Sequence, residues 1–364
     1  MNLKSLPLLL CLGLALLLVI YSPLASRGAR EGLALCGRVL IPSLYPFFVV
    51  GNVYAELGNQ KGREKKHLGR VLYCLLRQPP AALGAILLGL LGGYPMGAKM
   101  AVGCMEKGAL TRAQAQRLQL FCVNAGPAYL LGAVGAELLN SRRAGLLLLV
   151  SLTSASLVMA FLSRFYQGAG SRIQDAGEPP APSLLTPAPS LLTPASYPLT
   201  PILSAVSRAT AAIIGVCAWV ILFSSLCALL RLLPHALWPA IPGLHALLEV
   251  SGGAAAMARG GAALPALCAA LGWGGLGVHC QILGDLRKTG LPLRIFFVSR
   301  LAHGAIAAAF CWQLGRWFPV ELSAGAVAAA VQNARLWAVS APAAAALLFF
   351  CAFLILDLDL RRKI

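Results

Sequence analysis

The chain has 364 residues, of which 59% are hydrophobic and only 12% are charged. A soluble globular domain carries roughly twice that share of charged residues, so the composition excludes an ordinary soluble protein and favours one embedded in a lipid bilayer. The formal net charge is +18, but the basic residues lie in short stretches between apolar runs, as they do in the loops of membrane proteins. We therefore expect the bilayer, and not a nucleic acid, to be the partner of this chain.

Apolar runs occur along the whole chain and give the fold class. They cover residues 6–21, 39–54, 83–91, 145–161, 211–230, 295–310 and 339–356. Several approach the ~20 residues that a helix needs to cross a bilayer. The sequence predicts an all-α polytopic integral membrane protein with roughly eight to ten crossings and half-crossings. The first run follows Lys4 and resembles a signal peptide, but we expect an uncleaved anchor because the rest of the chain is itself membrane-embedded.

Motifs of known enzymes and metal sites are missing from the sequence. The 11 cysteines are scattered through apolar segments and form no Cys-x-x-Cys pair, which argues against a disulfide framework or a zinc site. HExxH, GxSxG and GxxxxGK[ST] are all absent. We expect neither a metal nor a cofactor, and no enzymatic activity. A catalytic dyad of Ser251 with His279 stays a weak alternative.

Residues 168–203 separate the chain into two parts. This segment is rich in Pro, Ser, Thr and Ala, and it contains the unit Ala-Pro-Ser-Leu-Leu-Thr-Pro twice, at 181–187 and 188–194. Such a stretch cannot hold a helix. The sequence predicts a disordered linker between an N-terminal membrane half, residues 1–167, and a C-terminal membrane half, residues 204–364.

Each half contains a glycine-rich interruption of an apolar segment. One is Gly-Gly-Tyr-Pro-Met-Gly-Ala-Lys at 92–99, and the other is Gly-Trp-Gly-Gly-Leu-Gly-Val-His-Cys-Gln at 272–281. Each precedes a short basic stretch with a glycine, at 106–108 and 287–290. Corresponding breaks in two halves are typical of transporters, because exposed backbone at membrane depth is tolerated only inside protein or beside a watery cavity. We expect two related halves, with broken helices and re-entrant-like hairpins around a central site. Whether the repeat is inverted or parallel stays open.

The first break predicts an anion pocket. Pro95 removes a backbone donor, and Gly93 and its neighbours loosen the helix. The amides that follow form a helix N-terminus, which attracts anions, and Lys99 adds a positive charge about one turn later. The alternative is a packing kink, with Lys99 reaching for the membrane surface.

Three further polar groups interrupt apolar segments. Asn124, before Gly126, has the donors and acceptors that suit a polar ligand; the alternative is a proline kink whose Asn satisfies loose carbonyl groups. Glu249 precedes Ser251 and Gly252, and we expect it to bind a coupling H+ or Na+, with pairing to Arg259 as the alternative. His279 can hydrogen-bond a substrate or titrate, although a buried histidine is more often structural. Arg300 and His303 are weaker candidates, expected at an interface.

The predicted site has these members. The substrate-binding residues are Gly93, Tyr94, Pro95, Lys99, Asn124, Gly126, Ser251, Gly252, Gly275, His279 and Gln281, and the ion-coupling residue is Glu249.

Several of these strings together resemble the YlbJ family of sporulation integral membrane proteins. They are residues 92–99, 121–127, 132–135 (Gly-Ala-Val-Gly), 248–253 (Leu-Glu-Val-Ser-Gly-Gly) and 274–281, preceded by 30–33 (Arg-Glu-Gly-Leu) and 42–47 (Pro-Ser-Leu-Tyr-Pro-Phe). The Gly-Tyr-Pro-x-Gly-Ala-Lys string is fairly specific, and the other strings gain weight from their order. The resemblance covers nearly the whole chain apart from the linker.

The resemblance implies a fold and a function. That family belongs to the nucleoside-recognition (Gate) proteins and is similar in plan to concentrative nucleoside transporters. It implies a role in spore formation, and more sharply the movement of dipicolinate, a planar dicarboxylate, across the outer forespore membrane into the developing spore. A nucleoside or nucleobase carrier, which has no need of Lys99, stays open, as does a non-transporting scaffold for spore-envelope (cortex) assembly. A homo-oligomer is also left open.

Overall fold

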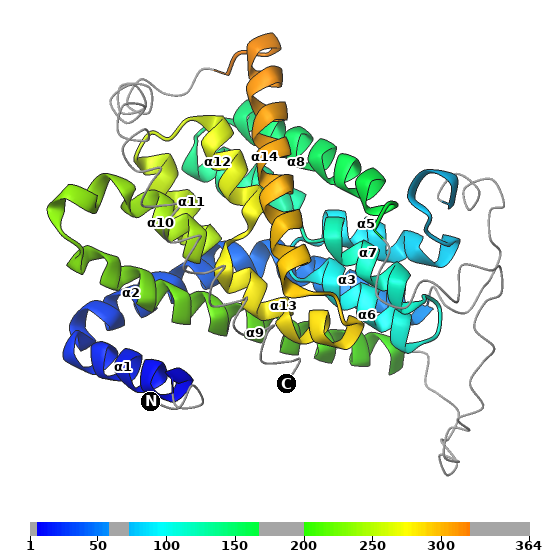
Figure 1. Ribbon diagram of the computed structural model, residues 1–364, viewed down its shortest axis with the longest axis horizontal. Coiled ribbons are helices and arrows are strands. Elements are labelled where there is room, and N and C mark those ends of the chain that lie inside the picture. Colours follow the sequence, from blue (N-terminus) through cyan, green and yellow to red (C-terminus); the bar gives the residue numbers. More distant parts are fainter. Residues whose placement is uncertain (1–5, 58–72, 167–199, 321–364) are drawn as a thin grey trace.

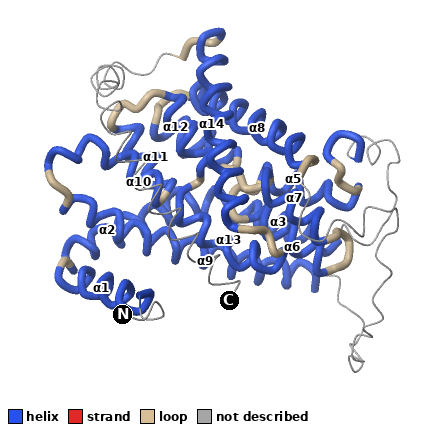
Figure 2. Tube along the Cα trace, viewed as in Figure 1, coloured by secondary structure: helices blue, strands red, loops and turns tan. Residues whose placement is uncertain are grey.

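The computed structural model describes residues 6–57, 73–166 and 200–320, and within these ranges the chain is helical with no strand (Figure 2). Five helical stretches are long and apolar enough to cross a membrane: Ser22–Val53, Arg142–Ser163, Ile202–Leu232, Leu264–Thr289 and Leu293–Trp317. Four shorter apolar helices accompany them in the described ranges. The prediction of an all-α polytopic membrane protein is confirmed. The last expected apolar run, 339–356, lies outside the described residues.

The helices of the first half follow one another in this order: α1 (Leu6–Ile20), α2 (Ser22–Leu35), a π-helical segment (Cys36–Leu40), α3 (Ile41–Leu57), α5 (Leu83–Leu91), α6 (Met96–Glu106), α7 (Arg112–Phe121), a second π-helical segment (Tyr129–Leu138) and α8 (Arg142–Ser163). Those of the second half are α9 (Thr200–Ala228), two short 3-10 turns (Leu229–Leu232 and His235–Ala240), α10 (Ile241–Leu248), α11 (Val250–Arg259), α12 (Leu264–Trp273), α13 (Gly275–Thr289) and α14 (Leu293–Trp317). Figure 1 shows both sets.

The two halves share the same order of parts. Each half has a long helix, then two broken helices, and then another long helix. The broken helices are α5–α6 and α7 with its π-helical continuation in the first half, and α10–α11 and α12–α13 in the second. This order corrects the pairing of breaks made from sequence. The break at 92–95 corresponds in order to the one at Glu249, and the break at 122–128 corresponds to Gly274. That the halves are related repeats stays a prediction.

The predicted linker lies almost wholly outside the described residues. Its last four residues, 200–203, already belong to α9, so the second half begins slightly earlier than expected. Pro201 is tolerated there because the first turn of a helix needs no backbone donor.

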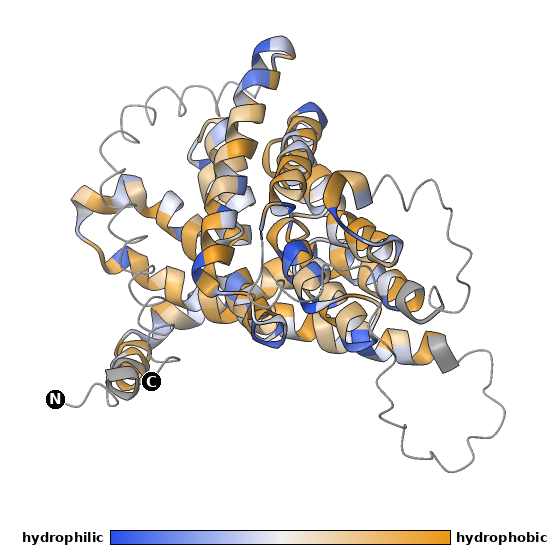
Figure 3. Cartoon of the chain, turned by 45° about the vertical axis from the view of Figure 1, so that its right-hand side comes forward, coloured by the Kyte–Doolittle hydropathy of each residue, from blue (hydrophilic) through white to orange (hydrophobic). Residues whose placement is uncertain are grey.

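Apolar side chains cover much of the outside of the molecule, and polar ones are concentrated in its interior. Apolar residues run along most of the helix lengths (Figure 3). Large exposed apolar side chains include Leu157 of α8, Ile214 of α9 and Val298 of α14, with 57%, 62% and 65% of their surface accessible. The buried polar residues include Gln116, Gln119, Asn124, Ser156, Glu249, His279, Arg300 and His303. A soluble protein rarely exposes so much apolar surface, whereas a bilayer covers it.

The two halves share one interior. Two glutamine side chains of α7 reach across the boundary. Gln116 Nε2 donates to the Thr289 carbonyl at 2.8 Å, and Gln119 Oε1 accepts from Thr289 Oγ1 at 2.6 Å. Tyr45 of α3 and Thr210 of α9 share a hydrogen bond at 3.1 Å. Because side chains from each half satisfy groups of the other, the halves cannot part without leaving buried polar groups unpaired.

Close packing of α2 against α9 depends on two glycines one helical turn apart. A Cβ on Gly28 would lie 2.4 Å from the Ser224 carbonyl oxygen, and one on Gly32 would lie 2.9 Å from the Ser224 side chain. Small residues four apart let membrane helices approach closely. Backbone atoms, which cannot move aside, form the closest contact at Gly28.

Gly28→Ala should therefore destabilise the protein by about 1–3 kcal/mol through overpacking. Gly215→Ala, on α9 where a Cβ would meet nothing within 4 Å, is the matched control and should be neutral or slightly stabilising, since alanine favours helix more than glycine does. Apparent melting temperatures of the two detergent-purified variants check this. Equal melting temperatures would contradict the packing argument.

Candidate functional site

Four helix breaks meet in the interior: residues 92–95, 122–128, Glu249 and Gly274. A Cβ on Gly93 would lie 3.1 Å from the Gly126 amide nitrogen, and one on Gly275 would lie 2.8 Å from the Val250 nitrogen. A Cβ on Gly274 would lie 3.3 Å from the ring of Tyr94. The breaks thus touch both within each half and between the halves. Gly93, Gly274 and Gly275 have positive φ angles of 75°, 87° and 75°, a conformation that side chains strain and glycine adopts freely.

Tyr94 joins the two halves at this centre. Its hydroxyl donates to the Leu271 carbonyl of α12 at 2.5 Å, and only 9% of the residue is exposed. Its phenol interacts electrostatically with both Arg300 and Glu249. Pro95, also buried, follows Tyr94 and precedes the first turn of α6.

Glu249 caps the N-terminus of α11 with its own side chain. Oε1 accepts from the Ser251 amide at 2.8 Å, and Oε2 accepts from the Gly252 amide at 2.6 Å. The residue is 3% exposed, and no ion pair joins it to Arg259 in the part of the chain that is described. The carboxylate occupies the place where a helix N-terminus would hold an external anion.

A small cavity adjoins Glu249. Its volume is about 30 Å³, and its lining includes Tyr94, Ser251, Gly277 and Gln281. That space holds about one or two water molecules. The hydroxyl of Tyr129 is buried nearby without a hydrogen-bond partner and interacts with Ser251. Of the predicted site residues, Tyr94, Glu249, Ser251 and Gln281 are brought together here.

Asn124 and His303 belong to a second polar cluster. Asn124 Nδ2 donates to the Phe121 carbonyl at 2.7 Å, and its Oδ1 accepts from Ser156 Oγ at 2.8 Å. Ser156 Oγ lies 3.0 Å from His303 Nε2, and His303 Nδ1 lies 3.1 Å from the Gly272 carbonyl oxygen. The contacts of Asn124 match the alternative reading, in which it satisfies a carbonyl group freed by the break.

His279 lies in an aromatic enclosure. Its Nε2 is 2.9 Å from the Trp273 carbonyl oxygen, and its ring meets those of Trp273, Phe296 and Phe297 edge to face at centroid distances of 4.4, 5.3 and 4.8 Å. It does not line the cavity beside Glu249. These contacts favour a structural role in joining α13 to the end of α12.

The central positive charge comes from Arg300. This residue of α14 is 1% exposed, and its guanidinium donates to the carbonyl groups of Leu120 and Val123 at the end of α7, where a cation also suits the helix dipole. Its Nε has no hydrogen-bond partner, and no carboxylate pairs with it within the described ranges. The sequence had placed Arg300 at an interface. The sequence feature that could have identified Arg300 as a site residue is its pairing with His303, since two ionisable residues one turn apart are unusual in an apolar helix.

Lys99 is not part of this cluster. It is exposed on α6, and it interacts electrostatically with Asp285 of α13. This arrangement fits the alternative reading of a lysine that reaches the surface.

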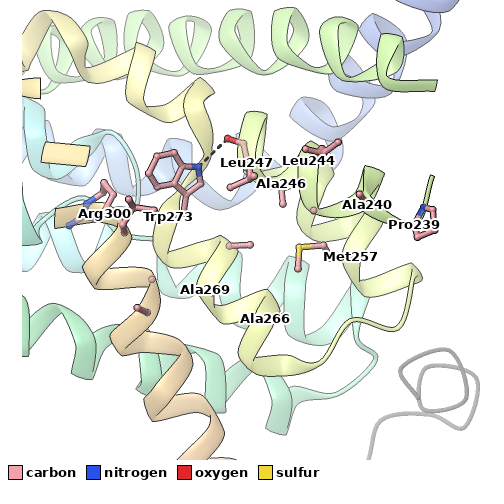
Figure 4. Close-up of a pocket in the computed structure, with 15 residues that line it drawn as sticks. Pro239, Ala240, Leu244, Ala246, Leu247, Met257, Ala266, Ala269, Trp273 and Arg300 are labelled. Carbon is pink, nitrogen blue, oxygen red and sulfur yellow. Dashed lines mark hydrogen bonds between the residues drawn. The ribbon is translucent and has the colours of Figure 1, made fainter. Parts of the chain in front are cut away.

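A larger cavity lies on the other side of Arg300. Its volume is about 280 Å³, and it is lined largely by small and apolar residues of α10, α11, α12 and α14. Figure 4 shows Trp273 and Arg300 at one end of it, with the Trp273 indole N–H donating to the Leu247 carbonyl at 3.0 Å. Trp273 and Arg300 thus line this cavity, and Trp273 directly precedes the break at Gly274.

Ser156→Ala should destabilise the protein by about 1–3 kcal/mol, because it leaves the buried Oδ1 of Asn124 without its partner. Ser163→Ala is a matched control on the same helix, since Ser163 Oγ bonds only the Ala160 carbonyl of its own turn at 2.7 Å, and should change stability by less than about 0.5 kcal/mol. Thermal unfolding of both variants in detergent measures the difference. Equal effects would refute the linking role of Ser156.

Comparison with known proteins finds a similar protein of the same general kind. No family model matches it, and no solved structure matches it. The sporulation integral membrane protein YlbJ of Bacillus subtilis (strain 168) is 27% identical over 356 residues, which cover 88% of this chain and 85% of that protein. The alignment extends through both halves, in agreement with the strings that resemble the family. The chain is thus similar over most of its length to a sporulation integral membrane protein.

Proposed function

We propose that this protein transports a small anionic solute across a membrane, and that dipicolinate is the solute. The observation that carries the proposal is Arg300, a buried cation that bonds carbonyl groups at one of the four meeting helix breaks and has no carboxylate partner among the described residues. An unpaired charge in a membrane interior is unfavourable and marks functional sites. A solute carboxylate would compensate it.

The cavities support a route through the same region. The cavity beside Glu249, at about 30 Å³, is too small for any organic solute, whereas the cavity of about 280 Å³ next to Arg300 approaches the size of small-molecule pockets. In our proposal a planar solute enters the larger cavity and reaches the breaks when Trp273 moves. The two halves then expose the site alternately.

The setting of this activity comes from the relative. Its name associates it with sporulation and with a membrane, and it says nothing of a solute. We propose the same setting for this chain, in the outer forespore membrane of a sporulating cell, and a Gate-type relation between its halves. The coupling ion acts at Glu249.

The alternatives account for less of the geometry. A nucleoside carrier has no need of a buried arginine, and a scaffold for envelope assembly has no need of a central cavity. A hydrolase using Ser251 is disfavoured, because His279 Nε2 bonds the Trp273 carbonyl and no hydrogen bond between Ser251 and His279 occurs in the described structure.

Uptake of labelled dipicolinate into liposomes that contain the purified protein tests the proposal. We expect saturable uptake that falls at least about tenfold, equivalent to 1.4 kcal/mol, in Arg300→Gln, because the cation that compensates the carboxylate is lost. Lys99→Ala should stay within about twofold of the parent protein, since Lys99 lies outside the cluster. Pyridine-2,6-dicarboxamide, which keeps the shape of the solute without its charge, should not compete.

Arg316→Gln, an exposed arginine of the same helix, controls for loss of charge, and the apparent melting temperature controls for folding. A folded Arg300→Gln protein with full uptake would refute the anion site. Uptake of uridine alone would move the protein to the nucleoside carriers. No uptake of either solute by folded protein would favour the scaffold.

A further inference from the structure

A histidine that the sequence did not single out lies one turn before Glu249. His245 of α10 and Glu249 are joined by the hydrogen bond from the Glu249 amide to the His245 carbonyl, at 2.7 Å. The side-chain Nε2 of His245 is buried and has no hydrogen-bond partner. A buried imidazole nitrogen without a partner is unfavourable, so this atom calls for an explanation.

Gly252 opens a space between the two side chains. A Cβ on Gly252 would lie 2.8 Å from His245 Nε2 and 3.0 Å from Glu249 Oε2. The imidazole and the carboxylate therefore flank the same side of Gly252. The φ angle of Gly252 is not positive, so the absence of a side chain, and not the backbone conformation, is what this position requires.

His245 also interacts with a carboxylate at the surface. Glu31 of α2, whose side chain is 57% exposed, interacts electrostatically with His245, while Glu249 is 3% exposed. The other charged groups that face His245 are Arg259 of α11 and Arg231 of the Leu229–Leu232 turn. The titratable groups that face Glu249 are Tyr94, Tyr129, Cys36 and Cys227.

We propose that His245 carries protons between the Glu31 side of the molecule and Glu249, so that the coupling ion is H+. The proposal rests on the proposed transport function. Protonated His245 gives its Nε2 proton to Oε2 of the Glu249 carboxylate, directly or through one water beside Gly252, and leaves a neutral imidazole and a neutral carboxyl group. Sodium is a worse fit, because hard cations prefer oxygen ligands and both carboxylate oxygens already accept amide hydrogen bonds.

The transfer explains how a proton and an anion would move together. A neutral carboxyl group accepts hydrogen bonds more weakly than a carboxylate, so the Ser251 and Gly252 amides are released. The N-terminus of α11 is then free to bind the carboxylate of the solute. When the solute leaves, Glu249 releases its proton on the same side as the solute, and its carboxylate caps the helix again.

Two variants test the relay. His245→Gln removes the titrating group and keeps a polar side chain, and Gly252→Ala keeps both groups but fills the space between them. Gly284→Ala is the matched control for the second variant, because a Cβ there would meet nothing within 4 Å.

The first measurement compares two modes of uptake in liposomes. In His245→Gln and Gly252→Ala, we expect dipicolinate uptake driven by a pH gradient to fall at least about tenfold. In His245→Gln, exchange of labelled for unlabelled dipicolinate at equal pH should stay within about twofold, because this variant keeps the amides of the α11 N-terminus unchanged. Gly284→Ala should behave as the parent protein in both modes. Driven uptake that survives in both variants, or that follows a Na+ gradient instead of the pH gradient, would overturn the relay.

The second measurement does not need transport. Carbodiimides modify protonated carboxyl groups, and mass spectrometry locates the modification at Glu249 in detergent-solubilised protein. We expect His245→Gln to move the pH of half-maximal labelling by at least about half a unit, because the two groups are linked. An unchanged profile would overturn the pair. If the parent protein moved no anion but showed this shift, the transport function would be refuted and the proton pair would stand.

Discussion

The backbone groups that four helix breaks release in an apolar interior must all find partners, because no water is available there to satisfy them. The structure meets this demand partly within each half and partly across the two halves. Arg300 of the second half donates to carbonyl groups of Leu120 and Val123 in the first, and Tyr94 of the first half donates to the Leu271 carbonyl of the second. The same contacts that complete each broken helix therefore hold the two halves together, and any opening between the halves exposes or rearranges them.

This arrangement also places charge where helix ends favour it. Arg300 lies at the C-terminal end of α7, and Glu249 caps the N-terminus of α11, each with the sign that the helix dipole stabilises. The two charges are held by backbone groups and not by each other. In the proposed function, the carboxylate of a solute takes the place of Glu249 at the α11 amides or compensates the charge of Arg300.

The sequence similarity and the geometry support different parts of the functional proposal. The Bacillus subtilis relative, at 27% identity, carries the association with sporulation and the membrane. The proposal that the solute is an anion depends on Arg300 alone, because Lys99 is exposed and the cavity beside Glu249 is too small for an organic molecule. The scaffold alternative does not account for the larger cavity that Trp273 and Arg300 line.

What the sequence by itself determined was local. Apolar runs predicted the helices, and glycine and proline predicted where they break, because both effects act within a few residues of the chain. The cap at α11 was within reach for the same reason, since Glu249, Ser251 and Gly252 are neighbours. Only the tertiary structure decided which breaks correspond, and which cation lies at the centre. Arg300 and Val123 are 177 positions apart in the sequence, and neither their residue types nor their spacing predicts a contact between them. The burial of Arg300 and the exposure of Lys99 follow from how whole helices pack, a property of the folded chain and not of any short segment.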